Sequence, residues 1–413
     1  MAGILKVDEI SEANQNDGVI LNNTVKVRLD DNSTKTLLST SGSNTTLNNI
    51  TLGSSTIPSS SFMFRNKIIN GGMQIDQRNA GSSVTPASGG YTVDRWVYEA
   101  TQSSKVACQQ VSTAPSGFVN SLKLTSNSAY TVAAGDVFQI VQRIEGSSIS
   151  ELAWGTTSAS TVTLSFKAYS SLTGTFGGFL RNSASDRYYV FKYSIPVANT
   201  WTDISITIPG DATGTWLTTN GYGLGIGWSL GCGSTYQTTA GSWGSGNNRG
   251  ATGQVDLVAT NGATLYITAV QLEIGTVATP FEHRPIGVEK SLCYRYYYRM
   301  TANPVNVSGT TNAAYIGFAI GRAYSTTAGT AILFLPEPLR TSPPVFNYSP
   351  ISGNNWDYGI SAMSLVDRQL ADTRTIAIYA TITVAQSQSS WLLATGNLSS
   401  STDSVFMDFS AEL

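Results

Sequence analysis

Two stretches of the chain combine aromatic rings with amide and carboxylate side chains, the residue types that bind sugars. Sugars present apolar C–H faces that stack on rings, and hydroxyl rims that bind Asp, Asn, Gln or Arg. The stretch NYSPISGNNWDYG is the stronger predicted glycan-binding loop, with candidates Tyr348, Asn354, Asn355, Trp356, Asp357 and Tyr358. The weaker one is GWSLGCGSTYQTTAGSWGSGNNR, with candidates Trp228, Tyr236, Trp243 and Asn247. Ordinary packing competes with binding, above all for Trp228, because tryptophan is usually largely buried.

The single histidine, His283, lies in LEIGTVATPFEHRP, where a strand ends and the chain passes Pro280 and Pro285. A general base needs an orienting carboxylate and a nucleophile within hydrogen-bond reach, and no Ser or Cys is marked out for that role. We therefore expect His283 to hydrogen-bond in a seam between two domains. No catalytic residue is predicted, and the chain is not expected to be an enzyme.

Other patterns that could do chemistry are weak. The run GYGLGIG (221–227) lacks the βαβ context of a dinucleotide loop, so we expect a glycine-spaced strand at a sheet edge and no cofactor. The 26 Asp and Glu residues could supply a glycosidase pair. No long run of short parallel coils, typical of a β-helix enzyme, is present.

Composition excludes several partners. Charged residues are 12% of the 413, about half the usual share, and the formal net charge is −2. This pattern gives no electrostatic footprint for nucleic acid or an anionic membrane. No apolar run is long enough for membrane insertion, and no targeting segment is visible. Cys108, Cys232 and Cys293 are odd in number and widely spaced, which favours buried, reduced thiols and synthesis in a reducing cytoplasm.

Period-two alternation of apolar residues predicts an all-β fold. It occurs in four stretches, 160–171, 201–209, 263–274 and 405–413. In the third we expect Tyr266, Thr268, Val270, Leu272 and Ile274 to share a face. A short helical turn is expected at 285–292. Many short strands with polar turns between them favour β-sandwiches or jelly rolls.

The chain falls into three predicted regions, 1–62, 63–284 and 285–413. The first is poor in large apolar side chains and rich in Asn, Ser and Thr. It is expected to be either disordered or ordered by copies of itself or by a larger assembly.

Several motifs carry a resemblance to a known family. FRNKIINGGMQIDQRN (64–79), YTVDRW (91–96), VQRIEG (141–146) and VQLEIGTVATPFEHRP (270–285) are similar, in order and spacing, to landmarks of bacteriophage tail-fibre and receptor-binding proteins. The resemblance implies an elongated, homotrimeric fibre located on the phage tail and made in the bacterial host cytoplasm. It also implies an N-terminal virion-attachment segment, a jelly-roll middle domain akin to carbohydrate-binding modules, and a distal receptor-binding β domain.

In such a jelly roll the first and last strands would be neighbours, bringing VDRW beside VQLE. Asp94 and Glu273 are then expected to form salt bridges with Arg95 or Arg143. A structural calcium ion held by Asp94 and Glu273 with backbone oxygens is the alternative. The run Tyr294–Arg299 is expected to alternate as a strand, half in the core and half in a subunit interface.

The working hypothesis is a phage tail fibre, an adhesin whose N-terminus docks on tail or baseplate proteins and which binds a host surface polysaccharide. One alternative is a structural virion protein, a baseplate or head-decoration component that binds other phage proteins. The other is a polysaccharide depolymerase.

Overall fold

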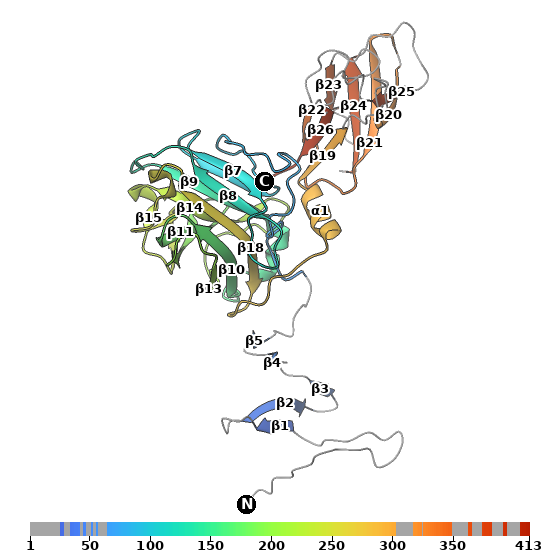
Figure 1. The fold of residues 1–413 in the computed structure, drawn as a ribbon. Coiled ribbons are helices and arrows are strands. Elements are labelled where there is room, and N and C mark those ends of the chain that lie inside the picture. The colour runs from blue at the N-terminus through green and yellow to red at the C-terminus, as the bar shows by residue number, and fades with distance from the viewer. Residues whose placement is uncertain are drawn as a thin grey trace, which may run out of the picture. The chain divides into compact units, whose positions relative to one another are not determined.

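The structure, a computed structural model, divides into two units, Met1–Arg65 and Asn66–Leu413 (Figure 1). It describes residues 64–302, 317–323, 325–348, 362–365, 374–381, 391–394 and 405–413, and five strand segments nearer the N-terminus. The organisation into regions 1–62, 63–284 and 285–413 stays a prediction.

The first unit contains short antiparallel strands. One sheet has the order β1 (Val25–Arg28), β2 (Thr34–Ser41), β3 (Asn44–Thr46), and a pair is formed by β4 (Thr51–Leu52) and β5 (Ser55–Thr56).

The second unit begins with a large β-sandwich of two antiparallel sheets. The five-stranded sheet has the order β13 (Thr202–Ile208), β10 (Val162–Ser170), β18 (Thr264–Ile274), β8 (Ser121–Ser126), β7 (Val106–Val111). The six-stranded sheet has the order β16 (Trp243–Ser245), β12 (Arg187–Ile195), β11 (Gly174–Asn182), β14 (Tyr222–Cys232), β9 (Val137–Glu145), β6 (Trp96–Ala100). Smaller elements are the parallel pair β15 (Gln237–Thr238) and β17 (Gly250–Ala251), and the 3-10 turns Gly146–Ser148, Ser150–Leu152, Ser234–Tyr236 and Leu257–Ala259.

A smaller sandwich follows, so the predicted all-β fold with a second distal β-sandwich is confirmed. One sheet has the order β19 (Tyr297–Ala302), β26 (Val405–Ser410), β22 (Val345–Tyr348). The other has the order β23 (Ala362–Leu365), β24 (Thr375–Thr381), β21 (Ala328–Phe334), β20 (Gly317–Ala323), β25 (Trp391–Ala394). Leu333 and Ile378 of one sheet share a core with Met407 and Phe409 of the other.

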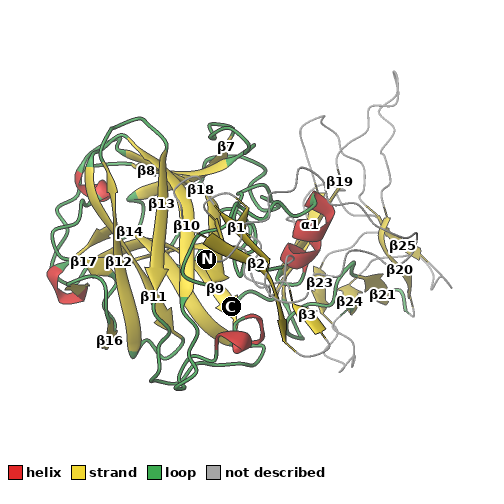
Figure 2. Cartoon of the chain, turned by 90° about the horizontal axis from the view of Figure 1, so that it is seen from below, coloured by secondary structure: helices red, strands yellow, loops and turns green. Residues whose placement is uncertain are grey.

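Strand alternation builds the core of the large sandwich. In β10, Val162, Leu164, Phe166 and Ala168 are all buried, as the sequence predicts. Figure 2 shows strands and loops throughout, with α1 (Ile286–Tyr294) as the main helix of the described residues. The helical turn predicted at 285–292 is thereby confirmed.

The predicted face of β18 is wrong in its first half. Leu265 and Ile267 enter the core there, whereas Tyr266 is half-buried on the other face. Ala269 has a φ of 56°, and the pairing with β10 shifts register between Ser165 and Lys167. A β-bulge adds one residue and so exchanges the two faces, which is why Val270 and Leu272 face the core after it.

The prediction for the tyrosine run 294–299 is also wrong. Helix α1 ends at Tyr294 and β19 begins at Tyr297, so the run does not alternate as one strand. The consecutive residues Tyr296 and Tyr297 are both buried. Their hydroxyls donate to carboxylates, Tyr296 to Glu145 at 2.8 Å and Tyr297 to Asp408 at 2.9 Å.

The expected pairing of VDRW with VQLE is wrong, because the two segments belong to different sheets. β6 pairs with β9, and β18 lies between β10 and β8. Asp94 accepts hydrogen bonds from Gln77 and lies 3.8 Å from Arg78, whereas Glu273 accepts from Gln271 and Thr279. The structure therefore does not bring the two carboxylates together as one salt-bridge or calcium site.

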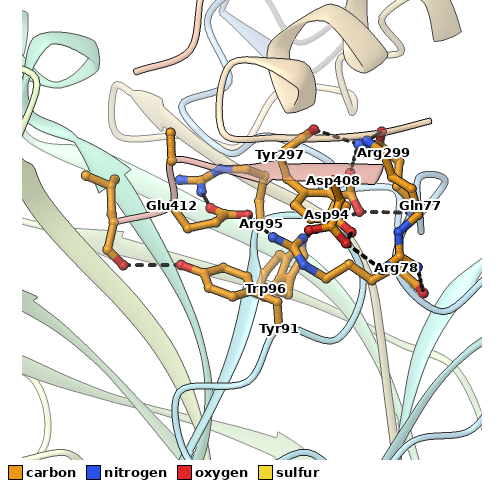
Figure 3. Close-up of polar contacts among 12 residues, drawn as sticks. Gln77, Arg78, Tyr91, Asp94, Arg95, Trp96, Tyr297, Arg299, Asp408 and Glu412 are labelled. Carbon is orange, nitrogen blue, oxygen red and sulfur yellow. Dashed lines mark hydrogen bonds and ion pairs between the residues drawn. The ribbon is translucent and has the colours of Figure 1, made fainter. Parts of the chain in front are cut away.

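Buried ion pairs join the large sandwich to the end of the chain (Figure 3). Arg95 pairs with Glu412, donates to the backbone oxygen of Arg143 at 2.6 Å, and stacks 3.5 Å above the Tyr296 ring. Arg78 pairs with Glu412 at 3.1 Å and lies 3.8 Å from Asp94, and Arg299 of β19 donates to the backbone oxygen of Arg78 at 2.6 Å and to Asp408 of β26 at 2.7 Å. We call this set of contacts the seam.

Asp94 makes the stability of the seam depend on pH. Burial raises its carboxyl pKa from 3.8 to about 6, although Arg78 and Gln77 oppose the shift. A raised pKa means that the folded state binds the proton more tightly, so this contribution is fully present below pH 4 and is lost as pH rises through 6. Relative to the Asp94→Asn variant, the native chain should therefore lose about 2 kcal/mol of unfolding free energy between pH 4 and pH 7. Urea unfolding at both pH values measures it; a difference that stays constant would contradict the shifted pKa.

Candidate functional site

An open pocket of about 470 Å³ lies at the outer face of the six-stranded sheet, on β6 and β9. Its lining includes Ser88, Glu99, Thr101, Arg143, Tyr236 and Arg249. We call it the Glu99 pocket.

Strand alternation places the charged residues of this pocket on one face. In β6, Trp96 and Tyr98 enter the core, so Glu99 points to the other side. The same alternation turns Arg143 of β9 and Arg181 of β11 outward. The sheet order β11-β14-β9-β6 then brings together side chains that lie up to 82 residues apart in the sequence.

Glycines in the intervening strand β14 leave room for this cluster. Gly225 lies in register between Arg181 and Arg143, and a Cβ there would come within 1.9 Å of the Tyr222 hydroxyl. That hydroxyl accepts a hydrogen bond from Nε of Arg181 at 3.3 Å. The predicted edge position of GYGLGIG is wrong, because β14 lies inside the sheet.

Glu99 is the centre of an ion-pair network. Its carboxylate accepts hydrogen bonds from Arg143 at 2.7 Å, Arg181 at 2.8 Å and Gln139 at 2.6 Å, and Nη1 of Arg249 lies 3.8 Å away. Burial raises the pKa of Glu99, but Arg181 and Arg143 outweigh that effect and hold it below its ordinary value. Glu99 is therefore a carboxylate at neutral pH.

Arg249 is the least engaged guanidinium of the network. Its Nε donates to Asn247 at 3.0 Å, and the group lies 5.7 Å from the centre of the Tyr236 ring. Neither Nη atom donates a hydrogen bond to any residue that the structure describes, and the side chain is 16% exposed. Burial, followed by repulsion from Arg181, lowers the pKa of Arg249.

Of the four glycan-binding candidates predicted in the weaker stretch, two lie at or beside the Glu99 pocket and two do not. Tyr236 lines the pocket, and Asn247 holds Arg249. Trp228 as a glycan-binding residue is wrong: it is fully buried against Trp96 and Phe166, so no sugar can reach its ring. Trp243 lies outside the pocket lining and packs edge-on against the largely buried rings of Trp154 and Trp216.

The stronger predicted loop lies mostly outside the described residues. This holds for Asn354, Asn355, Trp356, Asp357 and Tyr358, whose roles stay predictions. Tyr348 ends β22, packs against the core of the smaller sandwich, and accepts a hydrogen bond from the Met363 amide at 3.2 Å.

The expected hydrogen bond of His283 is wrong. Its ring packs against Phe118 and Phe281, with centroids 5.1 and 5.0 Å apart, and it has no hydrogen bond among the described residues. The histidine belongs to an aromatic contact at the exit from the large sandwich.

A second aromatic group lies on the outer face of the other, five-stranded sheet. Tyr169, Trp201 and Tyr266 are half-buried, with Tyr169 5.0 Å from Tyr266 and 5.5 Å from Trp201 between ring centroids. No sequence pattern singled out this group, since the rings come from β10, β18 and the residue just before β13, which are far apart in the sequence.

Metal and thiol sites are not favoured within the described part of the chain. No group of three or more His, Cys, Asp and Glu side chains gathers there. The cysteines are unpaired and buried, as predicted, and burial raises the pKa of both Cys108 and Cys232 to about 12. None of the helices in these ranges is long and apolar enough to span a membrane.

Sequence reasoning missed the Glu99 pocket as a unit. Its signal was the presence of charged residues in three largely buried strands, WVYEA, VFQIVQRIE and GTFGGFLRN. Charges that persist in buried strands are usually paired. The sequence alone could not show that the partners would be one another.

No family model matches the chain, and no curated protein matches it. It is similar in structure to the enzymatically active domain of tailspike protein 4 from bacteriophage CBA120, with 14% identity and a TM-score of 0.29, over 51% of this chain and 21% of that one. The family 11 carbohydrate-binding module from Clostridium thermocellum shares 12% identity at a TM-score of 0.25, over 47% of this chain and 97% of the module. A xylan-binding domain from Paenibacillus barcinonensis shares 10% identity at a TM-score of 0.24, over 48% and 97%.

Proposed function

We propose that this chain is a glycan-binding adhesin, the subunit of a homotrimeric phage tail fibre that attaches the virion to a host surface polysaccharide. The observation that carries the binding role is the Glu99 pocket, which is open and lined by a ring, hydroxyls and charged hydrogen-bonding groups. The resemblance of 64–79, 91–96, 141–146 and 270–285 to tail-fibre proteins supports the rest of the proposal.

The pocket chemistry suits a sugar. Tyr236 offers a ring for an apolar C–H face, and Ser88, Thr101 and Glu99 can exchange hydrogen bonds with hydroxyls. A weak site is sufficient in this design, because linked copies raise apparent affinity by about 10²- to 10⁴-fold when the geometry allows joint engagement. The N-terminal unit would dock on tail or baseplate proteins, and the loop around Trp356 would add a second contact.

Binding without hydrolysis is part of the proposal. Retaining and inverting glycosidases need two carboxyl groups, one of them an acid with a raised pKa. Of the residues that line the pocket, Glu99 alone has a carboxylate, and its arginine neighbours lower its pKa. Release of new reducing ends from a bound polysaccharide would instead favour a depolymerase.

A pair of aromatic variants tests the location of the site. On an array of bacterial surface polysaccharides, Tyr236→Ala should weaken binding roughly ten-fold, because the stacking ring is lost. Trp201→Ala removes a half-buried ring from the opposite sheet and should leave binding unchanged. If the Trp201 variant loses binding and the Tyr236 variant does not, the Glu99 pocket is not the site.

The same preparations test the assembly and the class of protein. A mass in solution of about three times the 43.8 kDa chain is expected, and a monomer would contradict the trimer. A native chain that binds no polysaccharide but binds other virion proteins would favour a structural role over an adhesin.

A further inference from the structure

We infer that the Glu99 pocket selects anionic glycans, with Arg249 binding a carboxylate or phosphate group on the sugar. This inference rests on the proposed function and names the ligand class of the same site. Three observations carry it: the charge balance of the pocket, the unused donors of Arg249, and the way Arg249 is held.

The charge balance is positive. The carboxylate of Glu99 pairs with three guanidinium groups, those of Arg143 and Arg249, which line the pocket, and that of Arg181, which does not. This network has a net charge of +2. The whole chain has a net charge of −2, so this excess is local. Like charges held together at a partly buried site attract an anion more strongly than they would in water.

Two of the three arginines already have their acceptors. Arg181 donates to both Glu99 oxygens and to Tyr222, and its side chain is 7% exposed. Arg143 donates to Glu99 and to the backbone oxygen of Leu413, while its buried Nε has no acceptor among the described residues. Neither has a free pair of donors to offer to the pocket.

Arg249 does have such a pair. Nη1 lies 3.8 Å from Glu99, beyond hydrogen-bond distance, and neither Nη atom has a hydrogen-bond acceptor within the described ranges; Arg249 also lines the pocket. A guanidinium edge with two parallel N–H donors matches the oxygens of a carboxylate or phosphate, and such charge-assisted bonds are about twice as strong as neutral ones. A neutral sugar has no anionic group to accept this pair of charge-assisted hydrogen bonds.

The guanidinium is also held in place before a ligand arrives. Asn247 accepts a hydrogen bond from its Nε, so the side chain is held on the edge away from the two Nη atoms. The Tyr236 ring lies 5.7 Å from the same group and could stack on the sugar that carries the anion. Pre-ordering of this kind reduces the entropy that binding would otherwise lose.

The test uses each polysaccharide in two matched forms. Uronate-containing chains are compared with their carboxyl-reduced counterparts, and oligosaccharides with phosphate monoesters are compared before and after phosphatase. We expect binding to at least one anionic form and a roughly ten-fold or greater loss when its charge is removed. The arm that shows the loss identifies the anion.

Three variants of the full chain assign the effect to Arg249. Arg249→Gln should remove the preference for the charged form, and Arg249→Lys should keep only part of it, because lysine has the charge without the planar fork. Lys123→Gln removes one positive charge from the outer face of the opposite sheet, near Tyr266, and should keep the full preference. Thermal unfolding confirms that each variant is folded.

The outcomes separate the two proposals. Equal binding to charged and neutralised forms overturns the anionic preference and leaves glycan binding intact. Binding to neither form of any polysaccharide overturns the proposed function itself. A charge preference that survives Arg249→Gln but not Lys123→Gln would place it elsewhere on the molecule and contradict the role of Arg249.

Discussion

The Glu412→Gln variant is expected to lose about 3–5 kcal/mol of unfolding free energy, because the change breaks a buried ion pair at one end only. The Arg95 side chain is 1% exposed and that of Glu412 is 6% exposed. With glutamine at position 412, Arg95 stays charged in the seam without its carboxylate. Urea unfolding followed by circular dichroism measures the loss.

An exposed pair gives the matched control. Lys167 also pairs with an acid, but its partner Asp203 is 78% exposed, so Asp203→Asn should cost less than about 1 kcal/mol. In the double variant Arg95→Met with Glu412→Gln, the loss should be smaller than the sum of the single losses, since Arg95 is then not left charged without Glu412, while Arg78 keeps Asp94 at 3.8 Å. Equal effects of Glu412→Gln and Asp203→Asn would show that the seam is not a buried ion-pair site.

Trp228→Ala should destabilise the large sandwich by about 3–5 kcal/mol, because it opens a cavity in the core. The ring is fully buried, with centroids 5.5 Å from Trp96 and 5.3 Å from Phe166. Trp228→Phe should lose less than half as much. The indole Nε1 has no acceptor among the described residues, so phenylalanine gives up no hydrogen bond there.

The half-buried Trp201 is the control for size and residue type. Trp201→Ala removes the same side chain from the sheet surface and should cost about 1 kcal/mol. Chemical unfolding of the three variants under one set of conditions gives the ranking. If the Trp228→Ala and Trp201→Ala variants were equally destabilised, the result would contradict the burial of Trp228, and burial would no longer exclude its ring from contact with a sugar.

Some of the candidate site was accessible from the sequence. Tyr236 and Asn247 were singled out because a glycine-rich stretch with rings and amides favours sugar contact, and both lie at or beside the Glu99 pocket. The same pattern also selected Trp228, which the sheet buries. Composition cannot distinguish an exposed ring from a buried one, because an aromatic residue appears in the sequence in the same way whichever face of the strand its side chain lies on.

Local patterns determined the fold class, the strand at 162–170 and the helix after Pro285. Alternation and proline act over a few neighbouring residues, so a linear sequence displays them directly. The tertiary structure alone decided the bulge that exchanges the faces of β18 and the assembly of Glu99, Arg143, Arg181 and Arg249. Which strands become neighbours depends on contacts between distant parts of the chain. Charged side chains on different strands can pair only after the strand order of the sheet has brought them together.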